Sequence, residues 1–119
     1  RMTLLLALAV GLAGGVGAAL RYLVDNAVPP RIRARYPWGI AIVNLSGSFA
    51  LGAVTAAVPG VWLTIIGVGL LGGYTTFSTA AVDAARLIME RRFTAGVAGT
   101  FATLVGCVAL AGVGYAIFA

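Results

Sequence analysis

Asn44 and Ser48 are polar residues in the middle of an otherwise apolar stretch of the sequence. They lie four positions apart, so a helix places them on one face. An amide in hydrocarbon is costly unless it is hydrogen-bonded or wetted. Asn44 is therefore a candidate functional residue, or it joins two helices by a hydrogen bond. Both interpretations stay open on the sequence alone.

Residues 72–79 read Gly-Gly-Tyr-Thr-Thr-Phe-Ser-Thr, within a third apolar stretch. Glycines followed by threonines and a serine make a poor helix. Unwound backbone at membrane depth is tolerated where it is buried in protein or lines a cavity, and its free carbonyls can hold a cation such as Na⁺. The alternative is a continuous helix whose hydroxyls bond back to the preceding turn. Thr100, Thr103 and Cys107 form a mildly polar stripe in the last apolar stretch.

The charged residues exclude several kinds of function. The chain has no histidine, and its acids are Asp25, Asp83 and Glu90. These residues offer little for general acid–base catalysis or for a transition-metal site, so we expect no enzyme. All eight basic residues are arginines, and none is interleaved with aromatic residues in a solvated segment. The net charge of +5 therefore favours a role in membrane topology over nucleic-acid binding.

The composition predicts the elements that must position these residues. Hydrophobic residues make up 61% and charged residues 9%, with a mean hydropathy of +1.06, which is too apolar for a water-soluble globule. A membrane-spanning helix needs about 20 mostly apolar residues. We predict an all-α membrane protein, a single four-helix transmembrane domain over residues 1–119. Its predicted spans run over about 3–23, 38–58, 61–81 and 94–118.

Small-residue pairs suggest how these helices pack. Gly11/Gly15 and Gly69/Gly73 are each four positions apart, a spacing that lets helices approach closely in lipid. Four thin helices bury little surface on their own. We therefore expect a dimer.

Three motifs in order resemble one family over essentially the full chain. They are Gly-Gly-Val-Gly-Ala at 14–18 with Arg21-Tyr22, Asn-Leu-Ser-Gly-Ser-Phe at 44–49, and the 72–79 motif above. Together they are similar to the Fluc/CrcB family of small fluoride-specific ion channels. The resemblance implies an antiparallel dimer with two fluoride pores, in the plasma membrane of a prokaryote.

The resemblance also implies roles for individual residues. Asn44 would be the pore amide, Phe77 a pore-lining aromatic, and Arg21 a residue near the aqueous vestibule. Gly72 and Thr75 would give backbone carbonyls to a structural Na⁺ at the dimer axis, which is not transported. We expect the remaining pore hydroxyls to come from Ser48, Ser78, Thr79 and Thr103.

The chemistry of fluoride fits these residue types. Fluoride is small and strongly hydrated, so a dry pore must replace its water with N–H and O–H donors and with electropositive ring edges. A fixed cation in the constriction would hold the ion too tightly for conduction. No arginine lies between Val43 and Ala80. The expected function is passive export of cytoplasmic fluoride.

Two positions depart from the family pattern. Ala80 stands where most members have a second aromatic residue, and Cys107 stands where a hydroxyl is usual. One subunit of this kind is then not expected to build two equivalent pores by itself.

Two other functions compete with the channel. A small exporter of the multidrug-resistance type also has four spans, but it needs a membrane-embedded carboxylate, and the first span here has none. A non-conducting structural subunit would not need Asn44 or the 72–79 motif.

The arginines predict a fixed orientation. The linkers between spans 1 and 2 and between spans 3 and 4 hold Arg31, Arg33, Arg35, Arg91 and Arg92. The opposite side holds only Arg1. The positive-inside rule places the arginine-bearing linkers in the cytoplasm. An antiparallel dimer would then pair this chain with an oppositely oriented homologous subunit, whereas a homodimer would have to ignore the charge rule.

Overall fold

The computed structural model describes residues 2–119, and among these the side chains at 2, 3, 33, 34 and 78 lie outside the description. Every element in the described chain is helical, and η1 and η2 are π-helical. The elements are α1 (Met2–Ala27), α2 (Pro30–Arg35), α3 (Trp38–Ala57), α4 (Val61–Leu63), η1 (Thr64–Leu71), α5 (Gly72–Tyr74), α6 (Ser78–Met89), η2 (Thr94–Ala98) and α7 (Gly99–Phe118).

Four helices are long and apolar enough to cross a membrane. They cover Leu4–Ala27, Trp38–Ala57, Val61–Met89 and Thr94–Phe118. The expected all-helical architecture with four candidate spans is confirmed. The first and third helices extend beyond the apolar stretches of the sequence, to Ala27 and Met89, because their last turns continue as polar helix.

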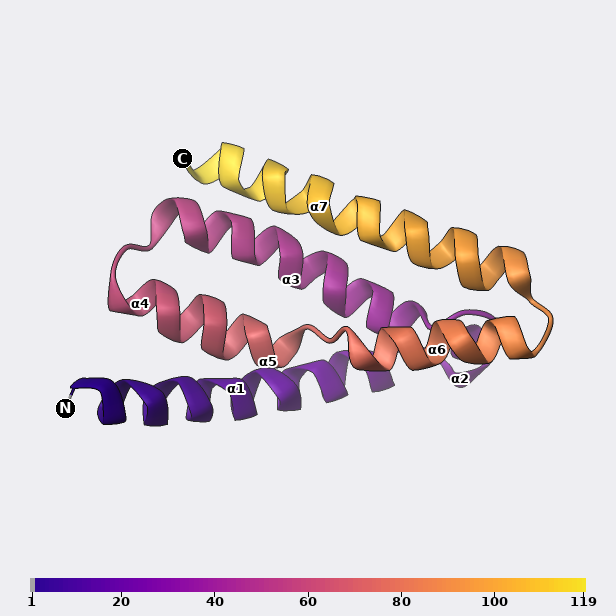
Figure 1. Cartoon of the computed structure of the whole chain (residues 1–119), viewed down its shortest axis with the longest axis horizontal. Coiled ribbons are helices and arrows are strands. Elements are labelled where there is room, and N and C mark those ends of the chain that lie inside the picture. Colours follow the sequence, from indigo (N-terminus) through magenta and orange to yellow (C-terminus); the bar gives the residue numbers. More distant parts are fainter. Residues whose placement is uncertain (1) are drawn as a thin grey trace.

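The four spans lie side by side in a molecule of 51 × 29 × 21 Å. Both termini and the turn before α4 lie at one end, and α2 and the turn after α6 lie at the other (Figure 1). Proline and glycine set these turns. Pro37 precedes α3, and Gly60, with a φ of 67°, precedes α4 in a left-handed conformation that glycine adopts without strain.

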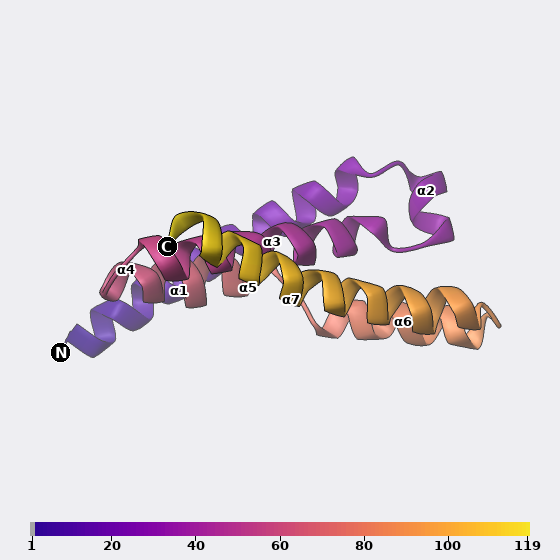
Figure 2. The same ribbon diagram turned by 90° about the horizontal axis from the view of Figure 1, so that it is seen from above.

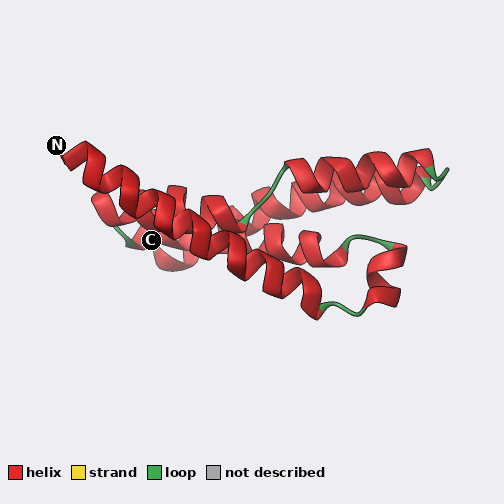
Figure 3. Ribbon diagram, turned by 90° about the horizontal axis from the view of Figure 1, so that it is seen from below, coloured by secondary structure: helices red, strands yellow, loops and turns green. Residues whose placement is uncertain are grey.

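The third span changes its neighbour half-way along. Its first half, η1 and α5, packs against α1, whereas its second half, α6, packs against η2. Figures 2 and 3 show the result: α6 and the start of α7 form one arm, and α2 with the adjoining ends of α1 and α3 forms another. Residues 75–77 lie between the two halves outside any helix, and Thr75 is extended, with φ −80° and ψ 159°.

Glycine lets these helices touch backbone to backbone. A Cβ atom at Gly17 of α1 would collide with the carbonyl oxygen of Leu70, and one at Gly73 would collide with the carbonyl oxygen of Gly14. A Cβ atom at Gly52 of α3 would likewise collide with the carbonyl oxygen of Ala111 in α7. Such close contact replaces the hydrophobic driving force that lipid does not provide between helices.

The core of one protomer is small. Its buried hydrophobic residues are Ile40, Ala41, Val43, Leu71 and Leu87, and no polar or charged residue is buried among the described side chains. Most large apolar side chains of α1 and α7 are exposed. This distribution suits a protein whose outer surface faces hydrocarbon.

Candidate functional site

A groove of about 320 Å³ runs between α3, the third span and α7. It brings together six of the residues expected to form the pore or the cation site, and also the two positions that depart from the family pattern. We call it the central groove. Its lining includes Asn44, Ser48, Gly72, Thr75, Phe77, Ala80, Thr103 and Cys107.

Asn44 makes two hydrogen bonds to one residue of the non-helical segment. Its Nδ2 donates to the carbonyl oxygen of Thr76 at 2.8 Å, and the backbone N–H of Thr76 donates to its Oδ1, also at 2.8 Å. The side-chain amide thus replaces the helical partners that Thr76 lacks. One N–H of Asn44 is left for another acceptor, because a primary amide carries two. Asn44 thus links α3 to the non-helical segment of the third span.

Side chains also satisfy other backbone groups around the 75–77 segment. The hydroxyl and the N–H of Thr75 both donate to the carbonyl of Leu71, at 3.0 and 2.9 Å. The N–H of Thr79 donates to the Thr76 hydroxyl at 3.3 Å, which caps the start of α6. These contacts hold the backbone where the helix hydrogen bonds stop.

The carbonyl oxygens in and just after α5 differ in whether they accept a hydrogen bond. Arg21 of α1 donates from Nε to the carbonyl of Gly73 at 3.3 Å. None of the described hydrogen bonds ends on the carbonyl oxygen of Gly72 or of Thr75. The two carbonyl oxygens that the family resemblance implies as cation ligands are therefore without a hydrogen-bond donor among the described contacts. Arg21 itself does not line the central groove.

Three further predicted pore residues differ in their placement. Phe77 lines the groove, but 86% of the residue is exposed, so one protomer alone does not enclose its ring. Thr79 does not line the groove; it lies in the first turn of α6, where its backbone N–H donates to the Thr76 hydroxyl. The side chain of Ser78 lies outside the described residues.

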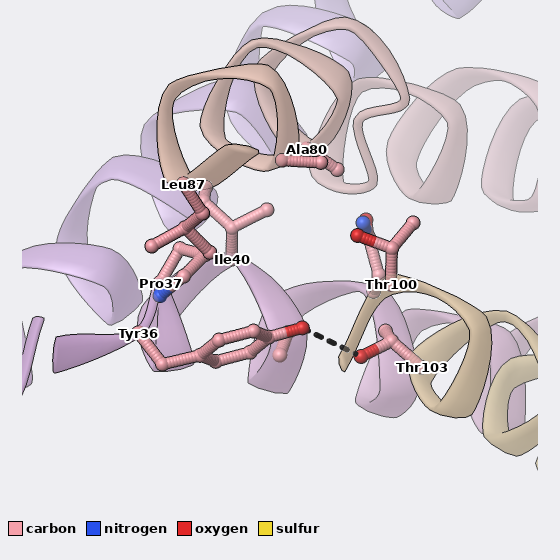
Figure 4. Close-up of a pocket in the computed structure, with 10 residues that line it drawn as sticks. Tyr36, Pro37, Ile40, Ala80, Leu87, Thr100 and Thr103 are labelled. Atoms are coloured by element: carbon pink, nitrogen blue, oxygen red, sulfur yellow. Dashed lines mark hydrogen bonds between the residues drawn. The ribbon is translucent and has the colours of Figure 1, made fainter. Parts of the chain in front are cut away.

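A second, smaller cavity of about 30 Å³ adjoins the groove, and we call it the small cavity (Figure 4). The two share Asn44, Ala80, Thr100 and Thr103, so these four residues border both spaces. The hydroxyl of Tyr36 points into contact with Thr103 Oγ1 at 3.4 Å. Sequence reasoning missed Tyr36 because it lies before Pro37, outside every predicted span.

Both spaces are lined by uncharged residues. No charged residue lines the central groove or the small cavity among the described residues. The described chain also holds no cluster of three His, Cys, Asp or Glu side chains that could bind a metal ion. The polar groups in these spaces are amide, hydroxyl, thiol and backbone groups, a set suited to an ion that must bind weakly and leave.

Comparison with known proteins assigns the family. The family model described as "CrcB-like protein, Camphor Resistance (CrcB)" matches residues 8–115. The chain belongs to the CrcB family. The resemblance inferred from the three sequence motifs is thereby confirmed.

Curated CrcB relatives are similar along most of their length. "Fluoride-specific ion channel FluC 1" of Leifsonia xyli is 44% identical over 99 residues, covering 79% of this chain and 72% of the relative. "Fluoride-specific ion channel FluC" of Solibacter usitatus is 38% identical, covering 82% and 84%. The FluC protein of Rhodospirillum centenum is 38% identical, covering 95% and 89%. These relatives are ion channels, a class distinct from enzymes, and with four apolar helices the chain is a multi-pass membrane protein.

The Asn44 contact predicts how residues 75–77 respond to Asn44→Asp. The carboxylate still accepts the N–H of Thr76, but it cannot donate to the Thr76 carbonyl and places a charge against it. Leaving this carbonyl unpaired costs about 1–3 kcal/mol, so amide exchange of residues 75–77 accelerates about tenfold or more. Hydrogen exchange followed by mass spectrometry in detergent measures it.

Asn26→Asp is the matched control. The amide of Asn26 donates to the Tyr22 carbonyl within α1 at 2.8 Å and is exposed. The same chemical change there leaves exchange of 75–77 unaltered. Equal exchange in wild type and Asn44→Asp would show that Asn44 does not hold this segment.

Proposed function

We propose that this protein is a subunit of a fluoride-selective channel through which cytoplasmic fluoride leaves the cell passively. The observation that carries the proposal is an uncharged groove beside Asn44, an amide with one N–H still free after it binds Thr76. The names of the curated relatives support fluoride as the ion. Passive flow requires only donors that bind the ion weakly along its path.

Donors of several kinds would replace the water around fluoride. Asn44 offers an amide N–H, Ser48 offers a hydroxyl in the groove, and Phe77 offers the electropositive edge of its ring. Phe77 is almost fully exposed in one protomer. A second subunit that covers this face would complete the pore wall, as the antiparallel dimer expected from the family pattern would do.

The exporter alternative has no support from the position of the acids. Coupling to protons needs a carboxylate in contact with the transport site. Asp25, Asp83 and Glu90 line neither the central groove nor the small cavity. The channel therefore remains the function with the better-matched chemistry.

A structural Na⁺ is part of the proposal. Hard cations bind oxygen ligands, and the carbonyls of Gly72 and Thr75 lack a donor in the described hydrogen bonds. These two residues would hold the ion together with the same carbonyls of a second subunit at the dimer axis. The bound ion would supply positive charge that fastens two subunits together. Arg21 donates to the carbonyl of Gly73 and so leaves the carbonyls of Gly72 and Thr75 available to the cation.

The orientation proposal rests on where the arginines lie. The α1–α3 linker and the turn after α6 share one end of the molecule (Figure 1), and Arg31, Arg35 and Arg91 are exposed there. The positive-inside rule makes this end cytoplasmic. An antiparallel dimer then needs a homologous partner of opposite orientation, and Ala80 in the wall of both spaces fits a division of labour between unlike subunits.

Fluoride flux into liposomes tests the channel directly. We expect the protein, purified with any subunit that accompanies it from its native membrane, to pass fluoride and exclude chloride. In Phe77→Ile, losing about 1 kcal/mol of ring-edge attraction lowers fluoride flux about fivefold. Phe101→Ile is the control, because Phe101 is exposed on α7 and lines neither space. Equal fluoride and chloride fluxes would reject the channel, and wild-type flux in Phe77→Ile would remove its ring from the pore.

Ion replacement tests the Na⁺ site, since substitution cannot delete a backbone carbonyl. With N-methylglucamine in place of Na⁺ on both sides, fluoride flux falls to background because the subunits lose their shared cation. Adding Na⁺ restores the flux, and tracer ²²Na⁺ does not cross with fluoride. Undiminished flux without Na⁺ would contradict the proposed site.

Cysteine labelling tests the orientation. In a Cys107→Ser background, Ile32→Cys in α2 should react with an impermeant maleimide in inverted vesicles and not in intact cells, because the arginine-rich end stays in the cytoplasm. Pro59→Cys, in the turn at the other end, should show the opposite pattern. Similar labelling of Ile32→Cys from both faces would mean dual topology and a homodimer.

A further inference from the structure

The small cavity is sized for a single small ion. About 30 Å³ accommodates one water-sized particle, and fluoride is close to water in size. Most of the wall is apolar, from Pro37, Ile40, Ala41, Ala80, Ala84 and Leu87. Its polar side chains are Tyr36, Asn44, Thr100 and Thr103 (Figure 4). An ion that moved from the central groove past Asn44 into the small cavity would meet these polar side chains.

The two threonines do not supply donors to this cavity. Thr100 Oγ1 donates to the carbonyl of Gly96, and Thr103 Oγ1 donates to the carbonyl of Gly99 at 2.9 Å. A hydroxyl has one proton, so both side chains present lone pairs to the cavity. Tyr36 must therefore be the donor in its contact with Thr103. The donors that remain are the hydroxyl of Tyr36 and the second N–H of Asn44.

We propose that the Tyr36 hydroxyl is a fluoride-binding group of the conduction path, acting with Asn44 on an ion in the small cavity. This inference rests on the proposed function. The bond from Tyr36 to Thr103 is long, at 3.4 Å, and joins two neutral groups. Fluoride is a charged acceptor and forms the stronger bond. As the ion enters, the tyrosine proton turns from Thr103 to fluoride, and it returns when the ion leaves.

Local sequence explains why the tyrosine ring lies here. Tyr36 precedes Pro37, which favours an extended backbone, and its φ and ψ are −159° and 148°. The ring packs on Gly99, where a Cβ atom would lie 2.7 Å from the tyrosine hydroxyl oxygen. Trp38 supports the ring at a centroid distance of 5.0 Å. Gly99 thus leaves the space that the tyrosine fills.

Tyr36→Phe tests the hydroxyl while it keeps the ring. In the liposome assay, on protein purified with its accompanying subunits, we expect the half-saturating fluoride concentration to rise and flux to fall about tenfold. The melting temperature in detergent should stay unchanged, because the ring still packs on Gly99 and Trp38. Tyr115→Phe is the control, since that exposed tyrosine lies near the far end of α7.

Gly99→Ala tests the same position without altering the tyrosine. Its methyl group would displace the ring, so flux should fall as in Tyr36→Phe. Gly112→Ala, also in α7, meets open space and should conduct normally.

The outcomes separate this inference from the proposed function. Wild-type flux and half-saturation in Tyr36→Phe, with a fluoride-selective wild type, would overturn the role of Tyr36 and leave the channel intact. A wild type without fluoride-selective flux would overturn the channel and the role of Tyr36 together.

Discussion

The pairing of the Asn44 amide with the backbone of Thr76 is the interaction on which the rest of this molecule depends. Hydrocarbon offers no water to an interrupted helix, so each free N–H or C=O must find a partner within the protein. A side-chain amide carries one acceptor and two donors, and Asn44 meets both groups of Thr76 at 2.8 Å. Residues 75–77 can leave the helix because this partner lies on α3.

The interrupted backbone in turn shapes the bundle. The third span packs on α1 before residues 75–77 and on η2 after them. The halves diverge, and the central groove and the small cavity lie against α3 near this point. Glycines on α1 and α5 hold the first half by backbone contact, since the protomer has few buried apolar side chains. A protein with a small core can keep an open groove because close backbone packing and hydrogen bonds support it.

Hydroxyl groups in such a bundle do not all serve as donors. The protons of Thr75, Thr100 and Thr103 point to backbone carbonyls, at Leu71, Gly96 and Gly99. A Thr on a membrane helix commonly satisfies itself in this way. The number of polar side chains in a groove therefore overstates how many can donate to an anion. In the small cavity the choice narrows to an amide and a phenol, both uncharged, which suits an ion that must be released.

The sequence by itself determined the helical class, the four apolar spans and, through three ordered motifs, the family. These are properties of composition and of neighbouring residues, and each apolar stretch is long enough to be recognised as a membrane span from the sequence. It also marked Asn44 and the 72–79 motif, because polar or helix-poor residues at membrane depth are costly without a role, and the family resemblance then singled out Gly72 and Thr75. Tertiary structure alone decided that Asn44 meets Thr76, 32 positions away, and that Tyr36 reaches Thr103 across 67 positions. Such partners depend on where helices cross and how closely glycine lets them approach, and no local pattern in the chain records that.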